Sequence, residues 1–491
     1  MTDLAFKPAV ELAAALRNRE ISARELLEHY LDRIERYNPQ LNAIVHLDAD
    51  RARARADAAD AALARGELWG PLHGLPITIK ELFETEGFRW TAGDPQFAER
   101  VGQLNAPSTQ RLLDAGAIVM GVTNSPLNGM DVQTFNEVYG TTNNPWNLDR
   151  SCGGSSGGAA AALAAGLAAL EVGSDIGGSI RNPSHYCGTY GHKPTYGIVP
   201  RRRAAPPGFM GVGDLTVVGP MARSAADLDM ELALLVGAER DQAIAWRIAL
   251  PPPRRASLAA YRVAAWLDDP HLPVDNAVQA RLQAAVAALR QAGVEVDETA
   301  RPAIGELREA DRIYRSLLAA TTARAPAPLA GETAAEAFAR LAEREDALEP
   351  ETPTGGPSVQ HNAAVRHRTW LELNEKRHQM RYRWGEFFRQ FDVLLLPVTQ
   401  VTAIPHDHRP ANERHILVNG AERPYFDQLG WVGFITMAYL PATVAPIGCA
   451  ANGLPVGIQI VGPYLEDRTP IDFAARLANV VGGFEAPPGF A

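Results

Sequence analysis

Two serines in glycine-rich turns and a lysine at the end of an apolar run are the residues of this sequence best suited to chemistry. Ser155 lies in GGSSGG, Ser179 lies in DIGGSIR, and Lys80 ends the run LPITIK. A serine hydroxyl becomes a nucleophile when a neighbouring base accepts its proton, and a lysine can be that base once burial lowers its pKa. These residues therefore predict nucleophilic catalysis if the fold brings them together.

The segment between the two serine turns can return the chain to one edge of a sheet. Residues 159–170 are small and apolar and predict a buried helix, and residues 171–175 predict a short strand that runs into the second turn. In open α/β sheets, ligands bind where strands end at that edge. We therefore expect both serine turns at the same edge of the sheet.

Three competing roles for the glycine-rich segment stay open at this point. Gly153–Gly157 satisfy G-x-S-x-G, the nucleophile elbow, but the preceding NNPWNLDRSC is not predicted to be the strand which that motif requires. The glycines could cradle a phosphate at a helix N-terminus, although neither a G-K-[ST] ending nor an acidic partner is present. They could also serve only tight turns and close packing.

Strand-like and helical stretches alternate along most of the chain. We expect helices over 1–65 and 303–390, a further βαβ-like unit around a helix at 276–291, a proline-rich linker at 249–256, and strands at 75–80, 117–124, 391–399, 442–448 and 454–462. This alternation predicts an α/β protein: a single large α/β/α domain with a mostly parallel, mixed central sheet covered by helices on both faces.

The 491 residues are expected to form one domain, because the sheet pattern stops and later resumes. Within 1–491 we distinguish an N-terminal helical region (1–65), a catalytic core with the glycine-rich segment (66–240), a largely helical excursion that shapes the substrate pocket (241–390), and C-terminal strands and a helix that return to the core sheet (391–491).

Composition argues against several classes of protein. The net charge of −10 is the opposite of what phosphate-neutralising nucleic-acid binding needs, and 46% hydrophobic residues favour a buried core. Three cysteines do not make a disulfide framework, and the apolar stretch at 159–170 is too short to span a membrane. The first residues lack a signal-peptide pattern, so we expect a cytoplasmic protein. The run Arg201–Arg203 is expected either in a solvated loop or at a pocket rim.

Taken together, the motifs resemble the signature of the amidase signature family. The resemblance is carried by GGSSGGAAA, VGSDIGGSIRNPSHYCG and KPT, by GLPITIKELFET and GVTNSPLNGMDVQTFNEVYGTTNNPW upstream, and by VVGPMARSAADL, LPATVAPIG and GLPVGIQIVGP downstream. It covers most of the chain outside residues 240–391. Ala159 and His192 depart from the family pattern, which often has serine after GGSSGG and usually has GLKPT.

The resemblance implies a Ser-Ser-Lys catalytic triad. It assigns the nucleophile to Ser179, the bridging serine, usually held by a cis peptide bond, to Ser155, and the base to Lys80. A lysine of ordinary pKa is almost entirely charged at neutral pH, so this role requires burial of Lys80.

The resemblance also implies an oxyanion hole built from backbone N–H groups. These are the groups of Ile176, Gly177, Gly178 and Ser179, and the backbone of Gly129 is implied to face the substrate and the relay. Glycines in such a turn let several N–H groups point to one place, where negative charge develops in the transition state.

The implied activity is hydrolysis of carboxylic amides, with esters as a further class, through an acyl-enzyme and without metal or cofactor. The expected partner is a small amide, with no nucleic acid and no membrane, and members of this family are often homodimers. An alternative is the glutaminase subunit of a tRNA-dependent amidotransferase, although APPGFMGVGDLTVVGPM differs from the ASSLDQIGPM usual there. A binding protein on the same scaffold is a third hypothesis.

Other polar residues near the serines are expected to be structural. Asp175 is expected to pair with Arg181, and Ser156 to cap the following helix. Packing roles are expected for Cys152, Cys187, His185 and His192. Pocket walls are expected near 208–214, 362–383 and 431–439.

Overall fold

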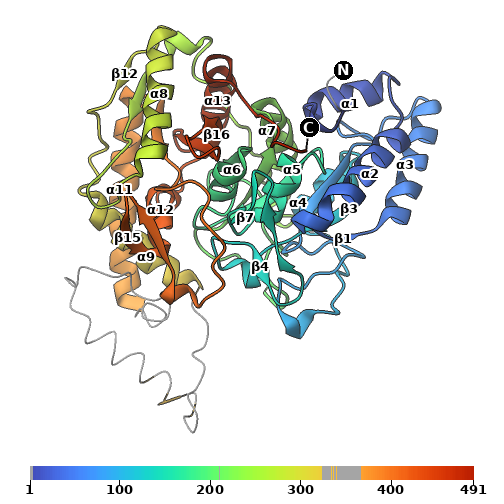
Figure 1. The fold of residues 1–491 in the computed structure, drawn as a ribbon, viewed down its shortest axis with the longest axis horizontal. Helices are drawn as coiled ribbons and strands as arrows, with labels where there is room; N and C mark the ends of the chain where they lie inside the picture. Colours follow the sequence, from blue (N-terminus) through green and yellow to red (C-terminus); the bar gives the residue numbers. More distant parts are fainter. Residues whose placement is uncertain are drawn as a thin grey trace.

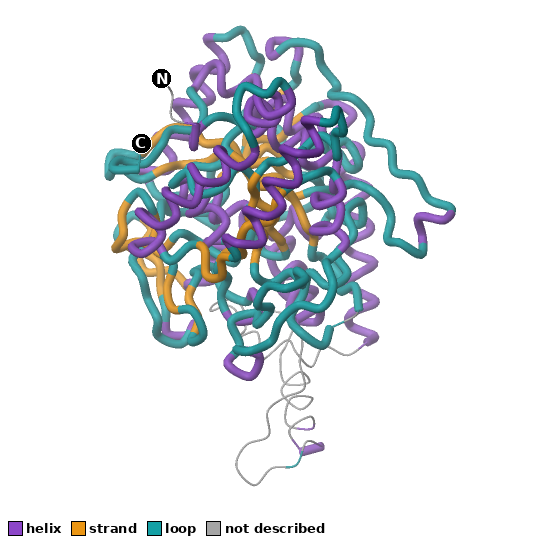
Figure 2. The backbone as a smooth tube through the Cα atoms, turned by 90° about the vertical axis from the view of Figure 1, so that its right-hand side faces the viewer, coloured by secondary structure: helices purple, strands orange, loops and turns teal. Residues whose placement is uncertain are grey.

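The computed structural model describes residues 4–490 except 210, 323–332, 334, 337–338 and 340–366. One eleven-stranded sheet crosses the molecule in the order β1-β3-β2-β8-β10-β9-β16-β17-β13-β11-β12. The N-terminal elements lie at one end of this sheet and the elements that follow residue 260 at the other (Figure 1). Seen from the side, the strands run between layers of helices (Figure 2). The predicted α/β fold, with helices on both faces of a mixed sheet, is confirmed.

The strands of the large sheet are short. Their bounds are β1 (Ile44–Leu47), β2 (Pro76–Lys80), β3 (Ile118–Thr123), β8 (Glu171–Asp175), β9 (Tyr190–Lys193), β10 (Val217–Ala222), β11 (Val263–Ala265), β12 (Val296–Asp297), β13 (Val393–Pro397), β16 (Ala442–Cys449) and β17 (Pro455–Val461). Three small hairpins accompany it: β4 (Phe135–Asn136) with β5 (Gly140–Thr141), β6 (Asn143–Asn144) with β7 (Asn147–Ser151), and β14 (His415–Val418) with β15 (Ala421–Pro424).

The described helices of the α type include both long surface helices and short buried ones. Their bounds are α1 (Ala9–Arg17), α2 (Ala23–Leu41), α3 (Ala49–Ala64), α4 (Pro107–Asp114), α5 (Gly157–Ala164), α6 (Arg181–Cys187), α7 (Ala225–Leu235), α8 (Asn276–Gln291), α9 (Leu307–Thr322), α11 (His367–Gln390), α12 (Gly430–Met437) and α13 (Arg468–Val481).

Parallel pairing occurs in two blocks of the sheet. The pairs β3-β2, β2-β8, β13-β11 and β11-β12 are parallel, and the other six pairs are antiparallel. Parallel neighbours need a crossover, and α4 and α8 are the helices that cross between β2 and β3 and between β11 and β12. A short turn joins β16 to β17, so that pair is antiparallel. The mixed sheet therefore has fewer parallel than antiparallel neighbours.

Strand β9 shows that helices cover both faces of the sheet. Successive residues of a strand point to opposite faces. A Cβ atom added at Gly191 would lie 2.3 Å from the Ser184 hydroxyl of α6. The next residue, His192, contacts Asp467 at the start of α13 with a ring nitrogen 3.1 Å from the carboxylate. Helices α6 and α13 therefore pack on opposite sides of the same strand.

Local sequence signals fix several of these elements. Ser22 and Glu25 form a capping box at the start of α2, and the predicted helix 276–291 and strand 171–175 have the predicted bounds. The prediction that NNPWNLDRSC contains no strand is wrong, because Asn147–Ser151 form β7. This strand pairs with β6 in a two-stranded hairpin, where local turn geometry outweighs the unfavourable composition, and its Arg150 also forms an isolated bridge with Pro405.

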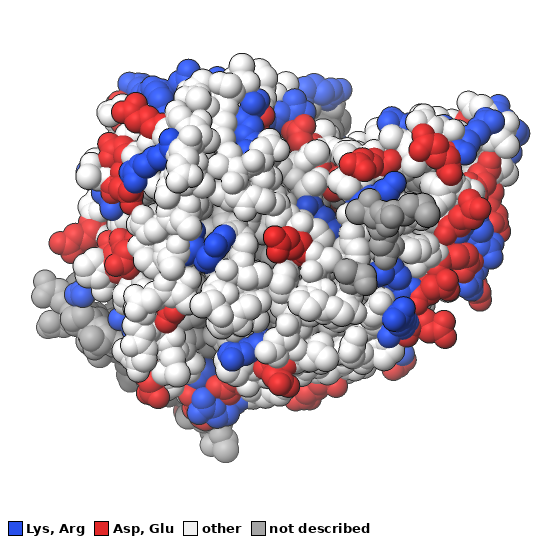
Figure 3. All heavy atoms as spheres, turned by 45° about the horizontal axis from the view of Figure 1, so that its top comes forward, with Lys and Arg blue, Asp and Glu red and all other residues white. Residues whose placement is uncertain are grey.

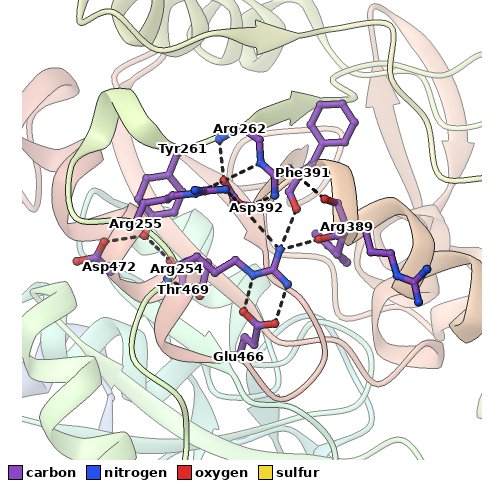
Figure 4. Close-up of polar contacts among 11 residues, drawn as sticks. Arg254, Arg255, Tyr261, Arg262, Arg389, Phe391, Asp392, Glu466, Thr469 and Asp472 are labelled. Atoms are coloured by element: carbon purple, nitrogen blue, oxygen red, sulfur yellow. Dashed lines mark hydrogen bonds and ion pairs between the residues drawn. The ribbon is translucent and has the colours of Figure 1, made fainter.

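The predicted linker at 249–256 has no helix or strand, and arginines attach it to the sheet (Figure 4). Arg254 forms two hydrogen bonds with Glu466, of 2.5 and 2.7 Å. Arg255 and Arg262 each lie 2.8 Å from the carboxylate of Asp392, which is buried just before β13. Burial alone would raise the pKa of Asp392, but these arginines hold it below its ordinary value. The linker is therefore fixed by partly buried ion pairs.

The surface carries charges of both signs. On the face shown in Figure 3, acidic and basic side chains are interspersed around a broad uncharged area. None of the helices in the described part of the chain is long and apolar enough to cross a membrane.

Candidate active site

Lys80 is buried at the end of β2 and faces serine hydroxyls. Its Nζ lies 2.7 Å from Oγ of Ser155, 3.1 Å from Oγ of Ser156 and 3.0 Å from Oγ of Ser174. The side chain has no solvent exposure. Burial lowers the pKa of Lys80 to about 7, although the carboxyl groups of Asp175 and Glu171 oppose the shift. A substantial fraction of this amine is therefore neutral at neutral pH and able to accept a proton.

Ser155 lies in the turn that leads into α5, and the peptide bond between Gly154 and Ser155 is cis. Ser156 occupies the N-cap position of α5, but its hydroxyl makes no capping hydrogen bond. The prediction that Ser156 caps this helix is therefore wrong: the Lys80 amine competes successfully for its oxygen. Ser174 was not predicted to belong to the site. It lies next to Asp175 in GSDIGG, where the only signal for it is a further hydroxyl near the nucleophile turn.

The turn that carries Ser179 is organised by one buried ion pair. Asp175 accepts hydrogen bonds from the backbone N–H groups of Gly178, at 2.9 Å, and Ile180, at 3.1 Å. Its carboxylate also lies 2.8 Å from Arg181, and both side chains are fully buried. Burial would raise the pKa of Asp175, but Arg181 overcomes this and the pKa is lowered. The pairing expected from the sequence is present, and it holds the turn in shape.

The N–H group of Gly178 is not available for an oxyanion hole in this structure, because it donates to Asp175. The implied role of Gly178 as a donor is therefore corrected: the carboxylate takes up this group and fixes the turn instead. Ile176, Gly177 and Ser179 do line a pocket. Tyr314 on α9 donates from its hydroxyl to the carbonyl oxygen of Ile176 at 3.0 Å. No sequence motif marks this contact, since it joins distant elements.

The two serine turns lie against each other. The backbone N–H of Ser156 donates to the carbonyl oxygen of Ser179 at 3.0 Å, and the Ser179 side chain is 6% exposed. Gly129 has a φ of 71° and lines the same pocket as Ser179. A Cβ atom at residue 129 would lie 3.6 Å from Oγ of Ser155, so glycine leaves room beside this hydroxyl. The structure thus brings the predicted residues to one place.

Part of the wall of the pocket at Ser179 comes from the helical region 241–390, which was expected to shape it, and part comes from segments that were not predicted. Besides the residues already described, the pocket is lined by Met130, Asp131, Val132, Arg315, Leu318, Ala319, Thr322, Phe426 and Leu429. The expected segments at 208–214 and 431–439 do not line it, and 362–383 lies partly outside the described residues. Trp431 is fully buried and packs on Trp266, so it belongs to the core.

The remaining polar residues of the motif are structural. Burial raises the pKa of the Cys152 thiol to about 12, so it remains protonated. Cys187 is likewise buried. His185 contacts the backbone oxygens of Gly457 and Val401, and His192 contacts Asp467. These residues hold α6 and β9 against the C-terminal strands.

The arginine run is neither a freely solvated loop nor part of the wall at Ser179. Arg203 pairs with Glu84, and Arg202 lies 3.1 Å from Asp241. Arg201 donates to the carbonyl oxygen of Gly213 at 2.5 Å. All three arginine side chains are half-buried, and the pocket at Ser179 does not include them. These arginines therefore form ion pairs and hydrogen bonds within the protein.

Comparison with known proteins agrees with this arrangement. The model of the amidase family matches residues 25–470. The chain is 34% identical to a glutamyl-tRNA(Gln) amidotransferase subunit of Acidothermus cellulolyticus, with 95% of this chain and 93% of that protein aligned. It is 33% identical to indoleacetamide hydrolase of Bradyrhizobium diazoefficiens, covering 96% and 86%. The structure of a bacterial aryl acylamidase superimposes with a TM-score of 0.75 at 25% identity, covering 97% and 96%.

A family match over nearly the whole chain and a fold shared with solved amidases define the class of this protein. It belongs to the amidase signature family, whose enzymes hydrolyse small amides.

Proposed function

We propose that this protein hydrolyses carboxylic amides through an acyl-enzyme on Ser179, with Ser155 and Lys80 as the proton relay. The observation that carries the proposal is the fully buried Lys80 amine, 2.7 Å from the Ser155 hydroxyl and with a pKa of about 7. A neutral amine at this position can take a proton from Ser155 as Ser155 takes one from Ser179.

In the first step the Ser179 oxygen attacks the amide carbon and forms a tetrahedral intermediate. The N–H groups of Ile176, Gly177 and Ser179 are the donors available at the pocket for the negative oxygen. The protonated relay then returns a proton through Ser155 to the nitrogen, so that the C–N bond breaks with release of an amine or ammonia. Water attacks the Ser179 ester in the same way and releases the carboxylate.

Substitution of Ser179 tests the proposal. Ser179→Ala should lower kcat for a neutral amide by at least about 10⁴-fold and abolish labelling by a fluorophosphonate, because the attacking oxygen is gone. Lys80→Met should lower kcat by about 10²–10⁴-fold, because the base is lost while the side chain keeps a similar volume. Ser257→Ala, at an exposed serine, and Lys376→Met, at a half-exposed lysine, are the matched controls. Full turnover by Ser179→Ala would refute the mechanism.

A second candidate is the glutaminase subunit of a tRNA-dependent amidotransferase. It is favoured by the likeness to the glutamyl-tRNA(Gln) amidotransferase subunit, at 34% identity over 491 residues. The likeness to indoleacetamide hydrolase favours a free-standing amidase at nearly the same identity. Ammonia release from L-glutamine that requires added partner subunits would select the glutaminase, whereas turnover of simple amides by the purified chain selects the amidase.

A further inference from the structure

The pocket at Ser179 is lined mainly by apolar side chains. Leu318 and Ala319 come from α9, and Phe426 and Leu429 come from the short 3-10 helix Tyr425–Leu429. Met130, which is 42% exposed, lies at the same pocket. An apolar group of a ligand placed here loses contact with water and gains contact with these side chains.

The two charged side chains of the pocket wall already have partners inside the protein. Asp131 accepts a hydrogen bond from Tyr425 at 2.6 Å and pairs with Arg414 at 2.6 Å. Arg315 lies 2.8 Å from Asp311 and 3.7 Å from Asp427. A charged substituent on the ligand would have to compete with these ion pairs, because removing one partner from a buried pair leaves the other uncompensated.

The geometry separates the two sides of the scissile bond. The leaving nitrogen must face the relay to receive its proton, and Gly129 is the wall residue whose Cβ position lies 3.6 Å from the Ser155 hydroxyl. A Cβ atom at Gly177 would instead lie 3.0 Å from the Tyr314 hydroxyl and 3.3 Å from Leu429. Because Gly129 lies on the side of the relay and Leu429 lies on the side of Gly177, we expect the amine to leave past Gly129 and the acyl group to extend toward Leu429 and α9.

We propose that the acyl site of this enzyme takes an uncharged alkyl or aryl group, and that Leu318 and Leu429 select it. This inference rests on the proposed acyl-enzyme at Ser179. The free zwitterion of L-glutamine carries two charges on its acyl part, and the pocket offers them only charged groups that are already paired. Each methylene added to a neutral acyl chain within the pocket should raise kcat/KM about fourfold.

A matched pair of amides tests the selection. 4-Methylpentanamide has methyl groups where L-glutamine has its ammonium and carboxylate groups, and both release ammonia. We expect kcat/KM for 4-methylpentanamide to exceed that for L-glutamine by at least about 100-fold. L-Glutamine must bring two charges out of water into a pocket without free partners for them, and 4-methylpentanamide carries no charge. A kcat/KM for L-glutamine equal to or above that of 4-methylpentanamide overturns the inference.

A substitution in the wall of the pocket at Ser179 provides the second test of the inference. Leu429→Asp should lower kcat/KM for 4-methylpentanamide about 30-fold or more, since it places a charge beside the acyl chain. Leu417→Asp makes the same exchange at a side chain that is 62% exposed on β14, and it should leave kcat/KM within twofold. An unchanged kcat/KM in Leu429→Asp overturns the assignment of the acyl site.

Fluorophosphonate labelling distinguishes failure of this inference from failure of the proposed function. Labelling reports the Ser179 nucleophile independently of the acyl group that the pocket prefers. Labelled Ser179 together with a preference for L-glutamine overturns the acyl-site inference and leaves the mechanism standing. Absence of labelling at Ser179 in the folded enzyme overturns both.

Discussion

At Lys80, a single buried nitrogen lies within 3.1 Å of three serine hydroxyls. Its proposed role requires the neutral amine, and burial lowers the pKa to about 7. Protonation below this pH removes the base, so kcat/KM for a neutral amide should fall about tenfold per pH unit below pH 6 and level off above pH 8. A pH profile of kcat/KM measures this directly.

Lys193 supplies the control for that profile. It is also fully buried with a pKa lowered to about 7, but its amine donates to the carbonyl oxygen of Pro194. Lys193→Met should leave the midpoint of the acidic limb of the pH profile unchanged. Loss of this limb in the variant would show that Lys193, and not Lys80, is the group that titrates.

The residues of the site are easier to predict from the sequence than their contacts. Lys80, Ser155 and Ser179 lie in motifs, and a motif specifies which residue types occur at which positions. The contact of Ser156 with Lys80 and the use of the Gly178 N–H by Asp175 depend on side-chain positions after folding. A local rule predicted the helix cap, and the family resemblance implied the oxyanion donor. The distant Lys80 binds the Ser156 oxygen instead, and Asp175, three residues before Gly178, accepts the N–H of Gly178.

Among the helices, α9 reaches the nucleophile turn through the hydroxyl of Tyr314. The carbonyl of Ile176 and the N–H of Gly177 belong to one planar trans peptide unit and point in opposite directions. The hydrogen bond from Tyr314 to this carbonyl therefore also fixes the direction of the Gly177 N–H. Gly433 on α12 permits this position, because a Cβ atom there would lie 2.2 Å from the tyrosine ring.

We therefore expect Tyr314→Phe to lower kcat about 5–10-fold with little change in KM, since one hydrogen bond that orients the oxyanion donor is lost. Steady-state kinetics measure this split, and circular dichroism checks the fold. Tyr382→Phe, at a tyrosine that is 71% exposed on α11, should change neither constant. A raised KM with unchanged kcat would show that Tyr314 contributes to binding and does not orient the donor.

The sequence pattern predicted the helices and strands better than it predicted the residues that line the pocket. The bounds of α8 follow from apolar spacing and flanking polar residues, and β8 lies between a small-residue helix and a Gly-Gly turn. Leu318 and Leu429 come together from segments more than a hundred positions apart, and no local pattern marks either as a pocket residue. The hairpin strand β7 was missed because its Asn and Asp residues are rare in strands.

Across the whole molecule, the two ends of the described chain pack on each other beside the first helices (Figure 1). The rings of Phe6 and Phe484 lie 6.0 Å apart, and those of Tyr37 and Phe490 lie 5.2 Å apart. Arg33 on α2 is nearly buried and donates to the carbonyl oxygens of Phe490, at 2.5 Å, and Ala165, at 2.9 Å. The last residues therefore hold α2 against the C-terminal end of α5, away from Ser155 at its other end.

Deletion of residues 483–491 should lower the free energy of unfolding by about 3–5 kcal/mol, because it exposes aromatic surface and removes one acceptor from the buried Arg33. Phe490→Ala keeps the backbone carbonyl and should lower the free energy of unfolding by about 3 kcal/mol. Urea unfolding measures both variants. The fraction of Ser179 labelled by a fluorophosphonate at 25 °C should be unchanged in each, since the lost contacts lie at the far end of α5. Equal stability of the truncated and full chains would show that the two ends do not support each other.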